Sequence, residues 1–417
     1  MDSVYSAGDS RASRSVAPIV SSSGDNRPNP ASGTRESSVI KEKAVDPATR
    51  VMRKVHPYPT HGKRFKLLTQ SSALAEIPKK MSVTDSQELS NYNEAFKLLK
   101  ENPPEQRLDV QLPFDMFLQL DEALSNLKST AGISEDQRYP SLGYNSHTET
   151  VTVVTCPSSI HERAARWIDS EFSQFVKAYL STHSPHTVGN IGLVGSTTKH
   201  FSDAVYAQSR KEPDGGFIYE TVDAAYSRLV IAVEVGYSEV RDKLHDDKDM
   251  WINGRGVNVV ILVFFKEKPR FKHPTTSRHR DITDRLAEMA VMSRAVGETA
   301  QSSMQRRYYG PLRYRGHAWI GELNEVYIEV WRRHGPPNTI NLIHEGFARP
   351  LADIPNTLGL WIRDFYPNDV WALEAANIED KEIPFDGASF LDGLRRASTT
   401  AAMDRFEGFL FDKLGLR

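Results

Sequence analysis

Apolar residues are unevenly distributed along the chain, and two long apolar runs stand out. The segments from Arg228 to Val235 and from Val257 to Phe265 consist mostly of β-branched and other apolar residues. Such runs are typical of strands that are buried on both faces. Helical patterns lie beside them, because apolar residues recur at helical spacing from Ala165 to Leu180 and a polar segment from Ser238 to Ile252 separates the two runs. This alternation predicts an α/β core.

Shorter patterns occur on both sides of this core. Two helical patterns lie between Thr84 and Leu127, and the segments Val151 to Thr155 and Gly216 to Tyr219 are strand-like. Three further strands and two helices are expected downstream, at 318–320, 326–331 and 358–362 and at 281–299 and 388–414.

These patterns divide the chain into five parts. Residues 1–60 are rich in Ser, and we expect a disordered arm because such a segment buries too little apolar surface to offset the entropy of ordering. The other parts are a helical N-terminal region at 61–150, an α/β core at 151–265, a basic loop at 266–280, and a strand and helix extension packed on the core at 281–417.

Composition excludes several classes of protein. The 417 residues include 52 Lys and Arg against 54 Asp and Glu, which excludes binding to nucleic acid through bulk positive charge but permits a local basic cleft. The single cysteine, Cys156, excludes a disulfide framework and a cysteine-based metal centre. No segment has the ~18 consecutive apolar residues of a membrane span. We therefore expect an intracellular protein of the nucleus or cytoplasm that does not enter a membrane.

The sharpest chemical signal is a pair of carboxylates. Asp214 follows Pro213 at a turn before a short strand, and Glu234 interrupts one of the most apolar runs in the chain. A buried carboxylate is unfavourable unless it is paired, hydrogen-bonded or bound to a cation. Two adjacent strands bring such groups together at one end of a sheet, where oxygen ligands suit Mg²⁺. The alternative is structural, with Glu234 paired to a neighbouring Arg or Lys and Asp214 capping a turn.

Pro213-Asp214, a hairpin-length gap and Glu234 in a buried strand together resemble the PD-(D/E)XK phosphodiesterase superfamily. The surrounding pattern from Lys211 to Leu262 is similar to uncharacterised fungal members, and the resemblance covers about residues 155–265. It implies a restriction-endonuclease-like core, in which a small mixed sheet is flanked by helices. The C-terminal strands and helices would elaborate that core.

The resemblance also implies a role for each matching residue. Asp214 and Glu234 would ligate Mg²⁺, with Mn²⁺ as an alternative ion, and the backbone carbonyl of Val235 would add a ligand. Glu162, on the first helix of the core, matches the place of a further acidic ligand. Its alternative role is that of a first-turn glutamate favoured by the helix dipole.

One motif position departs from the superfamily. The lysine of E-x-K, which helps to orient or deprotonate the attacking water, is replaced by Gly236. Lys243 and Lys248 on the following helix are candidates for a migrated lysine, because both flank its buried stripe. Asp247 falls inside that stripe and needs a partner. The alternative is that both lysines are solvated.

These observations predict a Mg²⁺-dependent endonuclease or related phosphodiesterase that acts on nucleic acid, with DNA favoured over RNA. The missing lysine favours an alternative, a catalytically degenerate nuclease fold that binds nucleic acid or another protein. A third hypothesis, a sugar-nucleotide transferase, rests on the pattern Asp247-Lys-Asp249. The loop 266–280, which has six Lys and Arg, is either a contact to a nucleic-acid backbone or a solvated insertion.

Overall fold

The computed structural model describes residues 83–415, apart from positions 104 and 202 and the segments 133–138, 184–188, 195–197, 222–225, 238–240, 276–280 and 374–377. The expected disordered arm at 1–60 therefore lies outside the described residues, and so do residues 61–82, Ser238 and the last part of the basic loop. The chain divides into two compact units at Gly62, and all of the described residues belong to the second.

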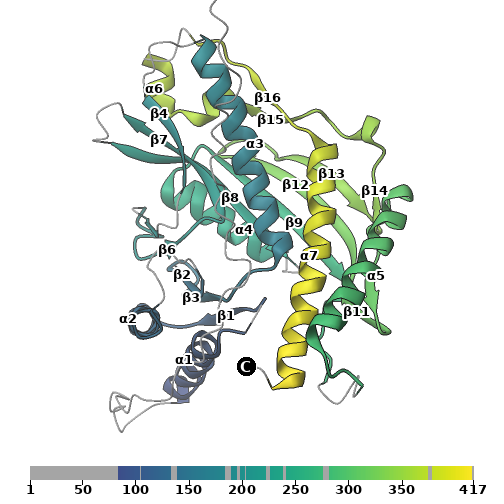
Figure 1. The fold of residues 1–417 in the computed structure, drawn as a ribbon. Helices are drawn as coiled ribbons and strands as arrows, with labels where there is room; N and C mark the ends of the chain where they lie inside the picture. Colours follow the sequence, from purple (N-terminus) through teal and green to yellow (C-terminus); the bar gives the residue numbers. More distant parts are fainter. Residues whose placement is uncertain are drawn as a thin grey trace, which may run out of the picture. The chain divides into compact units, whose positions relative to one another are not determined.

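A seven-stranded mixed sheet forms the centre of the described chain (Figure 1). Its strands lie in the order β14, β13, β12, β9, β8, β7 and β4. In chain order they are β4 (Gly189–Leu193), β7 (Gly215–Thr221), β8 (Ser227–Tyr237), β9 (Val259–Lys268), β12 (Glu322–Arg332), β13 (Asn338–His344) and β14 (Phe347–Ala348). The two apolar runs predicted as strands are β8 and β9, which pair in parallel, while the other neighbours are antiparallel.

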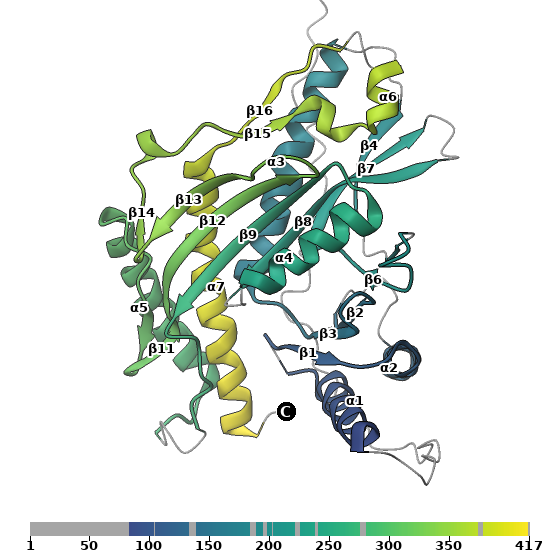
Figure 2. The same ribbon diagram turned by 180° about the vertical axis from the view of Figure 1, so that it is seen from behind.

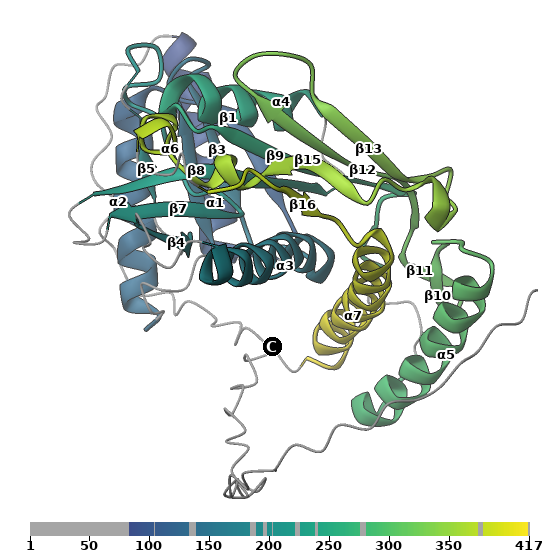
Figure 3. The ribbon, with the colours of Figure 1, turned by 90° about the horizontal axis from the view of Figure 1, so that it is seen from above.

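Helices cover both faces of this sheet. On one face lie α3 (Ser159–His183) and α7 (Gly387–Leu414), with α5 (Arg285–Gln305) packed beside α7. On the opposite face lie α4 (Arg241–Asp249) and the π-helical turn η1 (Met250–Arg255) (Figures 2 and 3). Because helices cover both faces of the sheet, consecutive residues of β8 are buried on both sides of the strand. The expected α/β class is confirmed.

A second, smaller sheet is built mainly from the N-terminal region. Its strands lie in the order β1 (Arg107–Gln111), β3 (Thr150–Val154), β2 (Ser141–Asn145), β6 (Arg210–Lys211) and β5 (Lys199–His200). The helices α1 (Val83–Glu101) and α2 (Phe114–Thr130) pack with this sheet around their own apolar core. The strand expected at 151–155 therefore joins this sheet rather than the large one. Its alternate residues are buried, as in a sheet that is covered on one face.

The C-terminal part of the chain extends the large sheet. The strand expected at 326–331 is β12, which pairs with β9 along its whole length, and β13 and β14 continue beyond it. The remaining short elements are β10 (Leu312–Tyr314), β11 (His317–Ile320), β15 (Thr357–Trp361), β16 (Glu382–Pro384), α6 (Asn368–Leu373) and the 3-10 turns η2 (Leu351–Asp353) and η3 (Ile362–Phe365). None of the described helices is long and apolar enough to cross a membrane.

Candidate active site

Glu234 lies near the end of β8, inside the protein. Only 3% of its surface is exposed, because β8 is covered by helices on both faces. Its side chain points to the α4 face, where the indole Nε1 of Trp251 donates a hydrogen bond of 2.5 Å to Oε1. The apolar run that builds the strand thus places one carboxylate where water cannot solvate it.

Asp214 approaches the end of the same strand from the turn before β7. Its Oδ2 accepts a hydrogen bond of 2.8 Å from the backbone N–H of Val235 and lies 3.2 Å from His161 Nε2 on α3. The chain then passes very close to β8. Gly216 has φ of +142°, and a Cβ atom there would lie 2.3 Å from the carbonyl oxygen of Ile231. Only glycine fits this close approach of the two strands.

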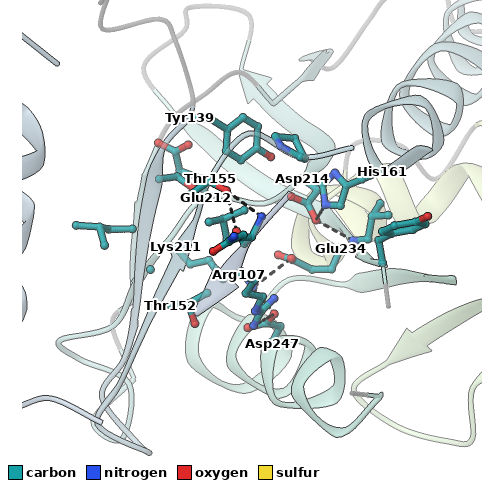
Figure 4. Close-up of a pocket in the computed structure, with 18 of the residues that line it drawn as sticks. Arg107, Tyr139, Thr152, Thr155, His161, Lys211, Glu212, Asp214, Glu234 and Asp247 are labelled. Carbon is teal, nitrogen blue, oxygen red and sulfur yellow. Dashed lines mark hydrogen bonds and ion pairs between the residues drawn. The ribbon is translucent and has the colours of Figure 1, made fainter. Parts of the chain in front are cut away.

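A lysine reaches the carboxylates from the second sheet. Lys211, the last residue of β6, places Nζ 3.1 Å from Glu234 Oε2 and 2.5 Å from Oδ2 of Asp247 on α4. Arg107 on β1 lies beyond, with one guanidinium nitrogen 3.6 Å from the same Asp247 oxygen. Figure 4 shows these side chains pointing toward one another. Elements of both sheets and of α4 therefore meet at one cluster of charges.

These groups line a cavity of about 120 Å³. Its floor consists of the strand ends of the large sheet together with α3 and α4. The second sheet lies across it and contributes Arg107, Ser141, Asn145 and Thr152. We call this second sheet the roof sheet. The cavity thus has Asp214, Glu234 and Asp247 on its floor and hydroxyl, amide and guanidinium groups on its roof, and the carboxylates of Glu105 and Glu212 line it beside the roof strands.

The electrostatics of the cluster are dominated by burial. Burial raises the pKa of Glu234 to about 8, and the carboxylates of Asp214 and Asp247 add to the effect, although Lys211 and the Trp251 hydrogen bond oppose it. Burial lowers the pKa of Lys211, but its attraction to Asp247 and Glu234 outweighs burial and raises that pKa overall. Lys211 is therefore an ammonium at neutral pH, and one lysine does not suffice to keep Glu234 ionised.

The structure brings Asp214 and Glu234 together, and Val235 joins them in the wall of the cavity. Glu162 does not line the cavity. It lies on the outer side of α3, where its carboxylate pairs with Arg166 at 3.0 Å.

The two lysines proposed as migrated residues also lie outside the cavity. Lys243 is half-exposed and lies 3.8 Å from Asp246. Lys248 is buried, but its Nζ pairs with Asp249 at 2.5 Å and lies 4.4 Å from the centre of the Trp331 ring. Lys211 occupies the place by Glu234 that either of them was expected to reach.

Sequence reasoning assigned no role to Lys211 or His161, although both had signals. Lys211 stands three residues before Asp214, within the quoted motif region. His161 stands at helical spacing from Ala165 and Ile168, so its place on the buried face of α3 was readable from the periodicity. Glu162, one residue later, falls about 100° around the helix and faces outward.

The donor set suits a hard divalent cation. Asp214 and Glu234 offer carboxylate oxygens on rigid strand ends, and Mg²⁺ is typically held by one or two carboxylates, with waters and substrate phosphate as its other ligands. Within the described ranges, no group of three or more His, Cys, Asp or Glu is arranged to hold a metal ion.

Comparisons of the chain with protein-family models, with curated proteins and with solved structures found no match.

Proposed function

We propose that the chain is a metal-dependent nuclease that hydrolyses phosphodiester bonds of nucleic acid in the cavity between the two sheets. One observation carries the proposal. Two carboxylates from adjacent strand ends, Asp214 and Glu234, converge with the ammonium of Lys211 in one cavity. Anionic ligands for a cation and a separate fixed positive charge are what a transition state with negative charge at phosphorus requires.

The metal would be held by Asp214 and Glu234, with the carbonyl of Val235 as a further ligand. A bound Mg²⁺ or Mn²⁺ supplies a water of lowered pKa and stabilises charge on the phosphoryl oxygens. His161 holds the Asp214 carboxylate from the other side, at 3.2 Å, so that its orientation is fixed before any ligand binds.

In the E-x-K motif the lysine stands two residues after the glutamate, where this chain has Gly236, and Lys211 takes the role of that lysine. Because the Asp247 carboxylate keeps the pKa of Lys211 high, Lys211 retains its proton at neutral pH. It therefore acts as a hydrogen-bond donor and fixed positive charge toward the attacking water or a phosphate oxygen, and not as a general base.

The order of elements supports a restriction-endonuclease-like core. Helix α3 is followed in the large sheet by three antiparallel strands, β4, β7 and β8, with β5 and β6 of the roof sheet between β4 and β7. Helix α4 then leads to β9, which is parallel to β8. The result is a mixed sheet with helices on both faces, and the two carboxylates lie where β7 begins and β8 ends. The C-terminal strands β12 to β14 elaborate this core by widening its sheet.

The degenerate-fold alternative also has a specific observation in its favour. The ammonium of Lys211 already bridges Glu234 and Asp247, as a cation would. If that bridge is permanent, the fold would bind nucleic acid or a protein without cutting it. The two functions differ in their response to divalent ions.

A cleavage assay on mixed DNA and RNA, with Mg²⁺ or Mn²⁺, tests the proposal. We expect the wild-type protein to cleave, and Asp214→Asn and Lys211→Met each to lower the rate by about 100-fold or more. Asp353→Asn and Lys243→Met are matched controls outside the cavity and should retain the wild-type rate. Absence of metal-dependent cleavage by the wild type, with a melting temperature that does not respond to either ion, would support the degenerate-fold alternative.

A further inference from the structure

The cavity is covered by a roof that is fixed to the core. Strand β6 of the roof sheet ends at Lys211 and leads within three residues to Asp214, so the roof and the floor share one short stretch of backbone. At the other edge, Arg405 on α7 donates a hydrogen bond of 2.7 Å from Nε to Glu105, two residues before β1. Arg405 is itself only 7% exposed. The roof sheet is thus tied down on both sides of the cavity.

A fixed roof limits the shape of what can reach the carboxylates. Glu234 is 3% exposed and lies beneath a cavity of about 120 Å³. In B-DNA each backbone phosphate is carried on a stiff duplex, and the grooves that separate the strands are about 6 and 12 Å wide. A duplex would have to bring its complementary strand under the roof together with the phosphate that reaches Glu234. A single strand bends freely and can enter one nucleotide at a time.

The roof offers the chemistry that a single strand needs. Arg107 places a guanidinium in the wall of the cavity, where Nε donates to Asp109 at 3.2 Å and another nitrogen lies 3.6 Å from Asp247 (Figure 4). A guanidinium is the preferred partner of a phosphate oxygen pair. Tyr139 adds an aromatic ring to the lining of the cavity, and stacking on aromatic rings is the sequence-tolerant way in which proteins hold unpaired bases.

We infer that this site acts on single-stranded nucleic acid, including unpaired strand ends, and that Arg107 in the roof holds a phosphate next to the bond that is cut. The inference rests on the proposed function and names its substrate class. DNA and RNA share the chemistry, since each offers unpaired bases and a flexible phosphodiester backbone.

The full-length protein with Mn²⁺ or Mg²⁺ is incubated with five probes: linear single-stranded DNA, circular single-stranded DNA, single-stranded RNA, blunt linear duplex and covalently closed plasmid. We expect at least one single-stranded probe to be cut about tenfold or more faster than either duplex, a ratio that corresponds to ~1.4 kcal/mol in free energy. Cleavage of the linear but not the circular strand would mean action from ends. Nicking or linearisation of the plasmid at a similar rate would overturn the inference and leave the proposed nuclease intact. Cleavage of no probe would overturn both.

Variants of the roof arginine test the phosphate contact. Arg107→Ala should raise KM for the single strand by about tenfold, as expected for the loss of a hydrogen bond to a charged group, with a smaller change in kcat. Arg107→Lys should recover part of that loss because it keeps the charge without the fork. Arg294→Ala, an exposed arginine on α5, is the matched control. A KM for Arg107→Ala equal to that of the control would show that Arg107 does not hold the substrate.

Discussion

Glu234→Gln should change the way in which stability depends on pH. Burial raises the pKa of Glu234 from an ordinary 4.5 to about 8. The unfolded chain therefore loses its proton above pH 4.5, whereas the folded protein keeps the proton until about pH 8. The stability associated with this proton is fully present below pH 4.5 and is lost as pH rises through 8. Glutamine carries no titrating proton, so the variant does not show this loss.

The size of the effect follows from the two pKa values. Over the full range from 4.5 to about 8, the loss amounts to ~5 kcal/mol in the free energy of unfolding. About half of this loss falls between pH 5 and pH 7, where the folded glutamate is protonated and the unfolded one is not. The loss of the Lys211 contact in the variant adds an offset to the free energy of unfolding, but the difference in slope comes from the glutamate.

Urea unfolding at half-unit steps from pH 5 to pH 8, in the presence of EDTA, measures that slope for both proteins. The wild type should lose stability relative to Glu234→Gln as the pH rises. Glu298→Gln, an exposed glutamate on α5, should run parallel to the wild type. Parallel curves for Glu234→Gln and the wild type would refute the reasoning, because they would mean that Glu234 is ionised in the folded protein at pH 5.

Two further predictions concern the framework of the site. Arg405→Ala removes the cation that lies 2.9 Å from the fully buried Glu267 and should lower the free energy of unfolding by ~3–5 kcal/mol. Arg396→Ala, on an exposed face of the same helix, is the control and should change the free energy of unfolding by less than ~1 kcal/mol in the same urea titration. Gly216→Ala should destabilise the protein or prevent folding, because its Cβ would meet a backbone oxygen at 2.3 Å. Gly297→Ala, with open space around it on α5, should raise the free energy of unfolding by up to ~1 kcal/mol. Equal melting temperatures for the two variants would contradict this account.

The sequence predicts the centre of the fold better than its edges. The strands β8 and β9 are found because burial on both faces leaves a continuous apolar run. The roof sheet escapes prediction because β1 and β2 are five residues each and only half-buried, and β6 has two residues. Its pairing of β2 with β6 joins Tyr144 to Arg210, a contact between distant parts of the chain that local periodicity does not encode.

The candidate site also has residues that the sequence predicts and residues that it does not. Glu234 is recognisable because a carboxylate in an apolar run demands an explanation, and Asp214 follows from the motif. The lysine that contacts Glu234 cannot be recognised from the pattern of α4. Lys248 flanks the buried stripe of that helix as expected, but its side chain lies over Trp331 and not in the cavity. Lys211 enters only because β6 joins the roof sheet, so its role depends on the part of the fold that the pattern does not predict.

A second buried glutamate shows what a structural carboxylate looks like in this fold. Glu329 on β12 is fully buried on the same α4 face. It accepts hydrogen bonds from Trp331 at 2.7 Å, from His245 at 3.0 Å and from Arg241. Burial raises its pKa, but these donors outweigh burial and the pKa falls below its ordinary value. Its charge is satisfied by the protein itself, and nothing further is needed to keep it ionised.

Glu234 differs from Glu329 in the balance of charge around it. It has one indole donor and one lysine, and that lysine lies closer to Asp247, at 2.5 Å, than to Glu234, at 3.1 Å. Burial and the carboxylates of Asp214 and Asp247 therefore outweigh these two partners, and the pKa of Glu234 rises where that of Glu329 falls. A purely structural ion pair would be expected to resemble Glu329. Glu234 thus differs from a structural glutamate such as Glu329, as the proposed metal-dependent nuclease requires of a carboxylate that exchanges its proton for a cation.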